Sequence, residues 1–193
     1  MAIERVNQYI KRVSFLGQNL SFFKSMSPFP DYPAKDVFYR GYLYSDRSAM
    51  KRLYRDLNGK REPGLALEAL YCISGRKAML VALSNAKYGP KASVIAMNMY
   101  YRNDRDFRDN TIHEGFIGVS ALFEGRGIAT RMRNLAKNHF ARAGLSGIST
   151  RISISNHASL RSAEKVGFSP IDSYWDHDMC EHRYYMICRL SPP

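Results

Sequence analysis

The stretch of this chain that decides the fold is Phe123-Glu124-Gly125-Arg126-Gly127-Ile128-Ala129-Thr130. An apolar run at 115–119 precedes it and a strongly periodic segment at 128–143 follows it, which predicts a strand that turns through glycines directly into a helix. The first backbone N–H groups of such a helix lack partners and carry the positive end of its dipole, so they form an anion site. Gly125 and Gly127 permit the tight turn and let a phosphate approach the backbone, while Thr130 adds a hydroxyl. The alternative is an ordinary strand–helix connection, where glycines are common.

The segments that follow extend this pattern. Residues 148–155 alternate with period two, which predicts a strand. Asn156 then suits an N-cap or a bulge at the strand end, and Gly167 suits the C-cap of a short helix whose apolar stripe is Leu160, Ala163 and Val166. The order is therefore strand, glycine turn, helix, strand, Asn, short helix and Gly-Phe.

This order resembles the GNAT superfamily of acyl-CoA-dependent N-acetyltransferases, over residues 111–170 and more weakly over 36–190. The resemblance implies an α/β (α+β) fold with a mixed, mostly antiparallel central sheet and helices on both faces. It also implies acetyl-CoA as the cofactor and co-substrate, from which an acetyl or short acyl group passes to a primary amine on a small molecule or protein. Residues 156–168 look like members that modify protein N-termini, including ribosomal ones, but the chain lacks the tryptophans that such members carry around the loop. The subgroup is unresolved.

The resemblance assigns cofactor binding to the glycine turn and its surroundings. The family's pyrophosphate loop reads Gln or Arg, two residues, Gly, one residue, then Gly or Ala. Glu124 departs from this pattern at the first place, which puts one side-chain contact in doubt but no backbone contact. A backbone N–H of the preceding strand faces the thioester carbonyl in the family. The expected cofactor-binding residues are Gly118, Val119, Gly125, Arg126, Gly127, Ile128, Ala129, Thr130, Arg131 and Asn156.

Two residues are candidates for the base that takes a proton from the amine. His113 has a suitable intrinsic pKa, and its place matches one where some family members carry a carboxylate base. Glu114 is the second candidate, although strand periodicity turns it to the opposite face unless a bulge intervenes. The alternative is that His113 is only a polar residue at the start of a strand.

The proton donor for the leaving thiolate is not identified. Many family members place a tyrosine on the short helix where this chain has Ala163, which leaves Ser162, Tyr174, Tyr184 or solvent for the role. Ala163 and Glu124 keep a second class of function open, a non-catalytic module of the same fold that binds acyl-CoA, RNA or the ribosome. A third variant is an acyltransferase whose donor is an acyl carrier protein.

Length and composition favour one main domain. The chain has 193 residues, of which 45% are hydrophobic, enough for one full core. We expect a helical extension over 1–35, with its helix over 2–24, followed by a single acyltransferase domain over 36–193. Within that domain the sequence predicts a short helix over 65–73, a strand over 94–101 and a charged hairpin loop over 103–110. The resemblance does not account for the extension, which has two candidate roles: to cover a sheet edge or to mediate contacts in a homodimer.

The charge and the cysteines constrain partners and compartment. The net charge is +12, from 29 Lys and Arg against 17 Asp and Glu, yet it is spread along the chain. Arg47, Lys51 and Arg55 form a stripe of the kind that amphipathic helices expose to solvent, so a nucleic-acid or ribosomal partner is not favoured. An odd count of three cysteines without a secretion signal predicts the cytoplasm. The longest uncharged N-terminal run, 13–23, is too short to span a bilayer.

The stretch 176–182 is rich in side chains that ligate metals. Its spacing fits no common zinc pattern, and it lies where the tip of a hairpin over 174–190 is expected. Because turns collect Asp and other polar residues without any metal, we predict a polar turn there and no metal site.

Overall fold

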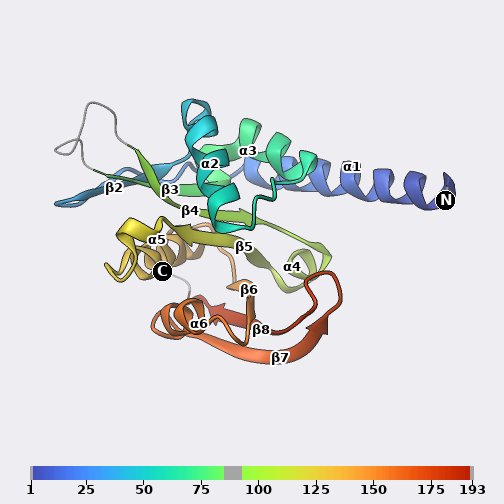
Figure 1. Cartoon of the computed structure of the whole chain (residues 1–193). Helices are drawn as coiled ribbons and strands as arrows, with labels where there is room; N and C mark the ends of the chain where they lie inside the picture. Colours follow the sequence, from blue (N-terminus) through green and yellow to red (C-terminus); the bar gives the residue numbers. More distant parts are fainter. Residues whose placement is uncertain (1, 85–92, 192–193) are drawn as a thin grey trace. The chain divides into compact units, whose positions relative to one another are not determined.

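The computed structural model describes residues 2–84 and 93–191 (Figure 1). The chain divides into two compact units, residues 1–97 and 98–193. The strand β4 (Val94–Tyr101) crosses this division, so it is the last strand of the first unit and the first strand of the second. The domain boundary predicted at residue 35 does not coincide with the division and stays a prediction.

The first unit joins helices to the strands β1-β2-β3-β4, in that order in the sheet. Its other elements are α1 (Ala2–Lys24), β1 (Tyr32–Pro33), β2 (Val37–Gly41), the 3-10 helix η1 (Tyr44–Asp46), α2 (Arg47–Leu57), α3 (Leu65–Ala78) and β3 (Met79–Ser84). The C-terminal part of α1 packs against α3, where Phe23 is fully buried and the Lys77 ammonium donates to the Lys24 carbonyl at 3.0 Å. Earlier in α1, the apolar stripe Val6, Tyr9, Ile10 and Val13 is exposed.

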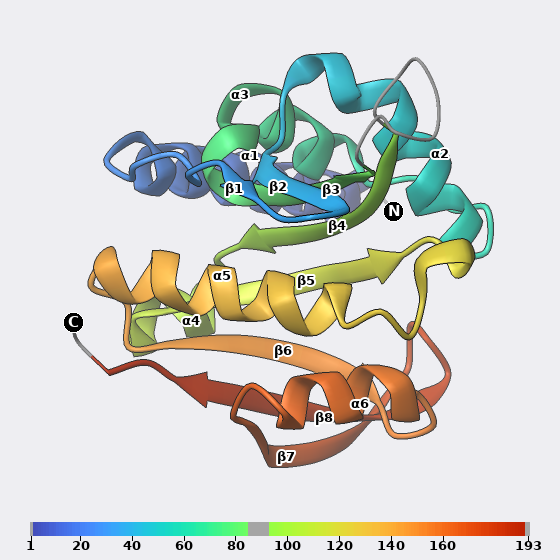
Figure 2. The same ribbon diagram turned by 90° about the vertical axis from the view of Figure 1, so that its left-hand side faces the viewer.

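The second unit has the strand order β4-β5-β6-β8-β7. Its elements after β4 are α4 (Asp104–Asp109), β5 (Thr111–Val119), the 3-10 helix η3 (Ala121–Phe123), α5 (Ile128–Arg142), β6 (Gly147–Ser153), α6 (His157–Glu164), β7 (Phe168–Asp176) and β8 (Glu181–Arg189). Strands β5 and β6 are parallel, whereas β8 is antiparallel to both β6 and β7. Helix α5 packs on β5 and β6 and α6 packs next to β7 (Figure 2). The mixed, mostly antiparallel sheet that was predicted is confirmed.

One predicted element is wrong. Residues 103–110 were expected to be a charged hairpin loop, but they form α4. The Asn103 side chain accepts hydrogen bonds from the N–H groups of Arg105 and Asp106, and the Asp106 carboxylate accepts from the Asn103 N–H in return. This reciprocal capping stabilises a helix of only six residues, and Asn110 ends it in a left-handed conformation with φ of 52°.

A second difference concerns the length of α3. The periodicity predicted a helix over 65–73, yet α3 continues to Ala78 through Ser74 and Gly75. Gly75 serves packing here and does not end the helix, because a Cβ at this position would lie 2.2 Å from the Tyr42 ring. The buried ring thus requires a glycine inside the helix.

Another close approach yields a test of the first unit. A Cβ added at Gly41 in β2 would lie 2.3 Å from the backbone carbonyl oxygen of Arg76 in α3. We expect Gly41→Ala to lower the free energy of unfolding by about 1–3 kcal/mol, because neither backbone segment can move aside cheaply. Gly17→Ala is the matched control, since Gly17 lies in α1 with nothing within 4 Å of the new Cβ. The control should unfold at an equal or higher denaturant concentration than the parent, and equal midpoints for the two variants would contradict this packing.

Candidate active site

The second unit contains an opening between two parallel strands. Pairing of β5 with β6 runs from Thr111↔Gly147 to Glu114↔Thr150 and then stops, although β5 continues to Val119 and β6 to Ser153. The first four residues of β5 are buried, Gly115 is exposed, and 116–119 are half-buried. We call the segments 115–119 of β5 and 151–153 of β6, which do not pair with each other, the fork; residues 151–153 pair with β8 on their other side. Its β5 arm presents backbone groups that no β6 residue satisfies.

The start of α5 forms the second part of the site. Gly125 and Gly127 have φ of 72° and 74°, and a Cβ at either position would meet nothing within 4 Å. Gly127 is the N-cap of α5 without any side-chain cap among the described residues, and the first helical hydrogen bond runs from the Arg131 N–H to the Gly127 carbonyl at 2.9 Å. The N–H groups of 128–130 therefore precede the first helical bond and face an open turn. This arrangement fits a phosphate group.

The charged side chains around this turn face solvent. Glu124, Arg126 and Arg131 are exposed, and Thr130 is half-buried. The Arg126 guanidinium donates to the Leu122 carbonyl at 3.2 Å and lies 5.0 Å from the Phe123 ring centroid. Both arginines are thus close in sequence to the uncapped helix end and accessible to an anion.

Asn156 lies just beyond the β6 arm of the fork. It is the N-cap of α6, where its side-chain oxygen accepts from the Ser159 N–H at 3.0 Å. The N-cap interpretation of the sequence is therefore confirmed. A contact of Asn156 with the cofactor stays a prediction.

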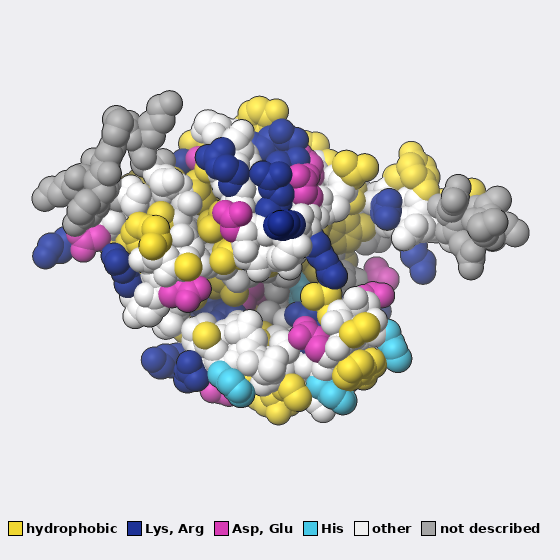
Figure 3. Space-filling view, viewed as in Figure 1, with side chains coloured by type: hydrophobic (Ala, Val, Ile, Leu, Met, Phe, Trp, Pro, Cys, Tyr) yellow, Lys and Arg dark blue, Asp and Glu magenta, His cyan; other side chains and the backbone are white. Residues whose placement is uncertain are grey.

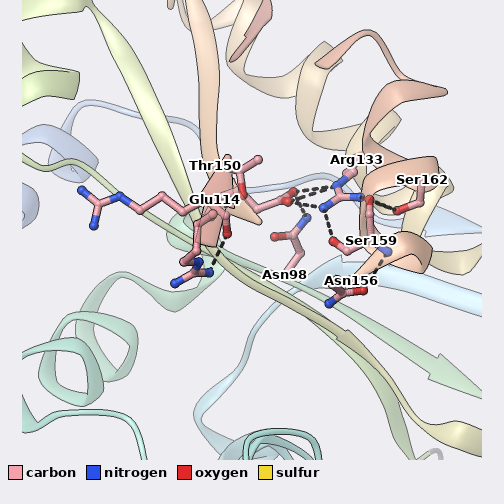
Figure 4. A network of polar contacts seen from close by, with 9 residues as sticks. Asn98, Glu114, Arg133, Thr150, Asn156, Ser159 and Ser162 are labelled. Atoms are coloured by element: carbon pink, nitrogen blue, oxygen red, sulfur yellow. Dashed lines mark hydrogen bonds and ion pairs between the residues drawn. The ribbon is translucent and has the colours of Figure 1, made fainter. Parts of the chain in front are cut away.

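Glu114 belongs to a buried network at the closed end of the fork. Its carboxylate forms an ion pair with Arg133 of α5, with 2.7 Å between Oε1 and Nη2, and accepts a hydrogen bond from the Asn98 amide at 2.9 Å. Arg133 also donates from Nη1 to the Ser159 carbonyl at 3.1 Å and to the Ser162 hydroxyl. Glu114 and Arg133 are only 2% and 1% exposed. Figure 4 shows Arg133 between Glu114 and the two α6 serines.

His113 belongs to a different buried network. Ser149 Oγ donates to the Asp106 carboxylate at 2.7 Å, so at its 2.8 Å contact with His113 Nδ1 the hydroxyl accepts and Nδ1 carries the proton. Thr111 Oγ1 donates to the same Asp106 oxygen at 2.7 Å. Burial lowers the pKa of His113 to about 4, with the cations Arg151 and Arg183 acting in the same direction and Asp106 and Glu114 opposing. The imidazole is therefore neutral at pH 7.

Neither candidate base is exposed to an acceptor. His113 is 3% exposed, and its ring centroid lies 5.1 Å from that of Tyr101, while Glu114 is held by Arg133. This geometry favours structural roles for both residues, and their catalytic roles stay predictions. Position 163 on the short helix, where many family members carry a tyrosine, is an alanine that is fully buried, so no phenol is present there.

Several residues of the site were missed by the reasoning from sequence. They are Asn98, Tyr101, Asp106, Arg133 and Ser149. A Cβ at Gly115 would lie 2.2 Å from the Tyr101 ring, so the glycine at the start of the fork makes room for this tyrosine. Arg133 could have been found, because it lies among the buried residues of α5 beside Met132 and Ala136, and a lone arginine there calls for a buried carboxylate.

The basic stripe of α2 lies in the first unit and is largely paired. Arg47 and Lys51 contact Glu68, with 2.9 Å for the lysine, and Arg55 lies 3.7 Å from Glu62. Figure 3 shows the basic side chains over α2 with acidic ones beside them. This pairing is what a solvated helix face requires and gives no support to a nucleic-acid site.

The predicted turn at the end of β7 connects β7 and β8. Asp176 Oδ1 accepts from the N–H groups of Asp178 and Met179, both at 3.1 Å, and β8 begins at Glu181. Within residues 2–84 and 93–191, no three His, Cys, Asp or Glu side chains are grouped to hold a metal ion. Over the same residues, none of the helices is both long and apolar enough to cross a membrane.

Comparisons with known proteins bear on this geometry. No curated protein sequence matches the chain. Three solved structures illustrate the fold it shares. They are the NatC complex bound to Gag peptide and CoA (17% identity, TM-score 0.70, 81% of this chain and 100% of that one), the ribosomal-protein-S18-alanine N-acetyltransferase from Escherichia coli (12%, 0.61, 80% and 94%) and yncA, a putative acetyltransferase from Salmonella typhimurium with its cofactor acetyl-CoA (17%, 0.64, 82% and 99%).

At these identities the similarity shows the fold. The family itself follows from a sequence model of the acetyltransferase (GNAT) family, which matches residues 47–168. The match spans more than half of the chain and includes β5, the glycine turn, α5 and α6. This protein belongs to the GNAT family of acetyltransferases, which use acetyl-CoA.

Proposed function

We propose that this acetyltransferase binds acetyl-CoA between the arms of the fork and acts on the α-amine of a protein or peptide. The observation that carries the proposal is the N-terminus of α5 without a side-chain cap, reached through η3 and two left-handed glycines after the β5 arm of the fork. The turn supplies donors for phosphates, and the fork supplies backbone that is not used in β5–β6 pairing.

Each part of the site has a proposed task. The N–H groups of 125–130 and the positive end of the α5 dipole hold the pyrophosphate, with Arg126 and Arg131 neutralising its charge. The arms of the fork hold the pantetheine chain, and the N–H of Gly118 or Val119 stabilises negative charge that develops on the thioester oxygen. Bound acetyl-CoA would supply an activated thioester; its acetyl group passes to the neutral amine as the C–S bond breaks, and the proton lost by the nitrogen ends on the thiolate to give the free thiol.

The choice of an α-amine follows from the burial of both candidate bases. An α-amine has a pKa of roughly 7.7–8.0, so about a tenth of it is neutral at pH 7, whereas a lysine with a pKa of about 10.4 is neutral to less than one part in a thousand. An acceptor that is already partly neutral needs only water to take its proton. Two of the similar folds point the same way, since one is bound to a peptide and CoA and the other is named for a ribosomal-protein alanine.

The cysteines and the exposed face of α1 bear on the cellular compartment and on dimer formation. Three free cysteines, of which Cys72 and Cys180 are exposed, support a reducing cytoplasm. The exposed apolar stripe of α1 supports a homodimer contact, which stays a prediction. A non-catalytic acyl-CoA-binding module, or a carrier-protein donor, is the alternative if no amine is acetylated.

An acceptor screen tests the α-amine proposal. Peptides with a free N-terminus should release thiol from acetyl-CoA, and mass spectrometry should place one acetyl group on the α-nitrogen. The matched controls are the same peptides with a blocked N-terminus and a free lysine, which should react at least about a hundredfold more slowly at pH 7 because so little of the lysine is neutral. Preferential acetylation of the blocked peptides would contradict the α-amine, and no product from any amine would favour the binding module.

A glycine pair tests the phosphate turn. Gly127→Val should weaken acetyl-CoA binding in calorimetry by at least about tenfold, because the new side chain occupies the approach to the helix end and strains a left-handed residue. Gly144→Val is the matched control. Gly144 has φ of 78°, a Cβ there also meets nothing within 4 Å, and it follows the opposite end of α5. Both variants should lose similar thermal stability, and equal loss of affinity in both would remove the turn from the cofactor site.

A pH profile tests His113. If the acceptor α-amine titrates, kcat/KM should fall on the acid side with an apparent pKa near 8, and His113→Asn, which retains a donor for Ser149, should keep both the rate within about threefold and the profile. A fall in kcat/KM of roughly 10²–10⁴-fold in His113→Asn, together with an apparent pKa of 6–7 in the profile of the parent, would instead establish His113 as the base.

The same substitution changes stability in a defined pH window. The folded-state pKa of about 4 lies below the ordinary value near 6.5, so the unfolded chain binds the proton first and folding stability is lost as pH falls from about 6.5 to 4. His139 contributes in the same window, since burial lowers its pKa to about 4 as well. Chemical denaturation across this range should show a shallower loss of stability in His113→Asn than in the parent, and identical slopes would contradict a neutral buried His113.

A further inference from the structure

Arg133 contacts both sides of the fork. Its Nε and Nη2 groups hold Glu114, which is the last β5 residue paired with β6. Its Nη1 group holds Ser159 and Ser162 on α6, the helix that follows the free end of β6. The Arg133 guanidinium therefore links β5, which carries one arm of the fork, to α6, which follows the other arm in the chain.

Strand pairing alone does not fix the distance between the two arms. Beyond Glu114 and Thr150 the arms share no hydrogen bonds, so other contacts must set their separation. A planar guanidinium whose donors are all engaged has few alternative positions, and here it is also 99% buried. Asn98, which is fully buried, holds the second carboxylate oxygen of Glu114 from β4.

We propose that the buried Glu114–Arg133 pair is a positioning device that sets the width of the fork, and with it the length of acyl group that the enzyme transfers. The pair acts through the strands and α6 and does not touch the reacting atoms. This inference rests on the proposed function, which places the thioester arm of the cofactor in the fork. Glu114 is thereby a positioning residue, and its charge serves Arg133 and not the acceptor amine.

A buried ion pair can be replaced by apolar residues without loss of stability, whereas removal of one partner leaves an uncompensated charge. This difference separates positioning from stabilisation. Glu114→Gln and Arg133→Met should each lower the melting temperature by roughly 10 °C. The double variant Glu114→Leu/Arg133→Met should recover the melting temperature of the parent to within a few degrees, because neither charge is left unpaired.

Activity should not recover with stability. In the double variant, the ratio of kcat/KM for butyryl-CoA to that for acetyl-CoA should rise by about tenfold or more, since a change in a pocket by one or two methylenes is worth at least that much. Asn134→Leu is the matched control, because Asn134 is exposed on the same helix next to Arg133. Its melting temperature and acyl preference should equal those of the parent.

A conservative variant keeps the test decisive if the double variant does not fold. Arg133→Lys retains a cation for Glu114 but cannot also hold α6 with the same geometry. It should stay folded and show the same direction of change in acyl preference. A double variant, or the lysine variant in its place, that is stable and keeps the acyl preference of the parent would overturn the proposal and leave the pair a stabilising one.

Hydrogen exchange separates failure of this inference from failure of the proposed function. Amides at 115–119 and 151–153 should exchange several-fold faster in the stable variants than in the parent, with or without an acceptor. If the parent acetylates no amine, faster exchange at the fork still supports the width-setting role and only the function falls. Unchanged exchange in a stable variant overturns the role whatever the activity.

Discussion

The backbone pairing between β5 and β6 ends at Glu114 and Thr150, and the second unit is arranged around this end. Where two parallel strands separate, the N–H and C=O groups that would have joined them need other partners, such as water or a ligand. The half-buried state of 116–119 fits such an opening. The turn into α5 then follows with the N–H groups that precede the first helical hydrogen bond, so the end of strand pairing and the anion site are close in the chain.

Charges near this break are satisfied inside the protein. Moving Glu114 and Arg133 out of water is costly, and the cost is offset because Nε, Nη1 and Nη2 of the arginine all have acceptors. On the neighbouring residue the protein uses a neutral imidazole, oriented by a hydroxyl that donates to Asp106. His113 and Glu114 are adjacent in β5, so their side chains point to opposite faces of the sheet. Glu114 is buried as part of an ion pair, whereas His113 is buried in its neutral form.

Most of the fold could be predicted from the sequence because its signals are local. The glycine turn, the period of α5, the alternation in β6 and the capping asparagine before α6 each lie within 15 residues or fewer. The predicted boundaries of β4 and α1 agree with the structure. The prediction of a loop over 103–110 was wrong, because the Asn and Asp residues that cap α4 are also typical of loops. The site was harder. Glu114 was noticed as a strand carboxylate, but its partner is 19 residues away on a helix, and only the packing of α5 on β5 and β6 brings them together. A single sequence shows the two charges and not their contact.

The contacts of Asp106 also limit where residues can be inserted or deleted during evolution. Its carboxylate joins three segments, since it accepts from Thr111 in β5, from Ser149 in β6 and from the Asn103 N–H that begins α4. An inserted or deleted residue between 103 and 111 would break this junction, so the connection has a fixed length. The turn 177–180 has local contacts of a different kind, because Asp176 accepts from the N–H groups of Asp178 and Met179 and the Cys180 thiol lies near the His177 carbonyl. Insertions that adapt such an enzyme to new acceptors would therefore accumulate at the β7–β8 end and spare the β4–β5 end.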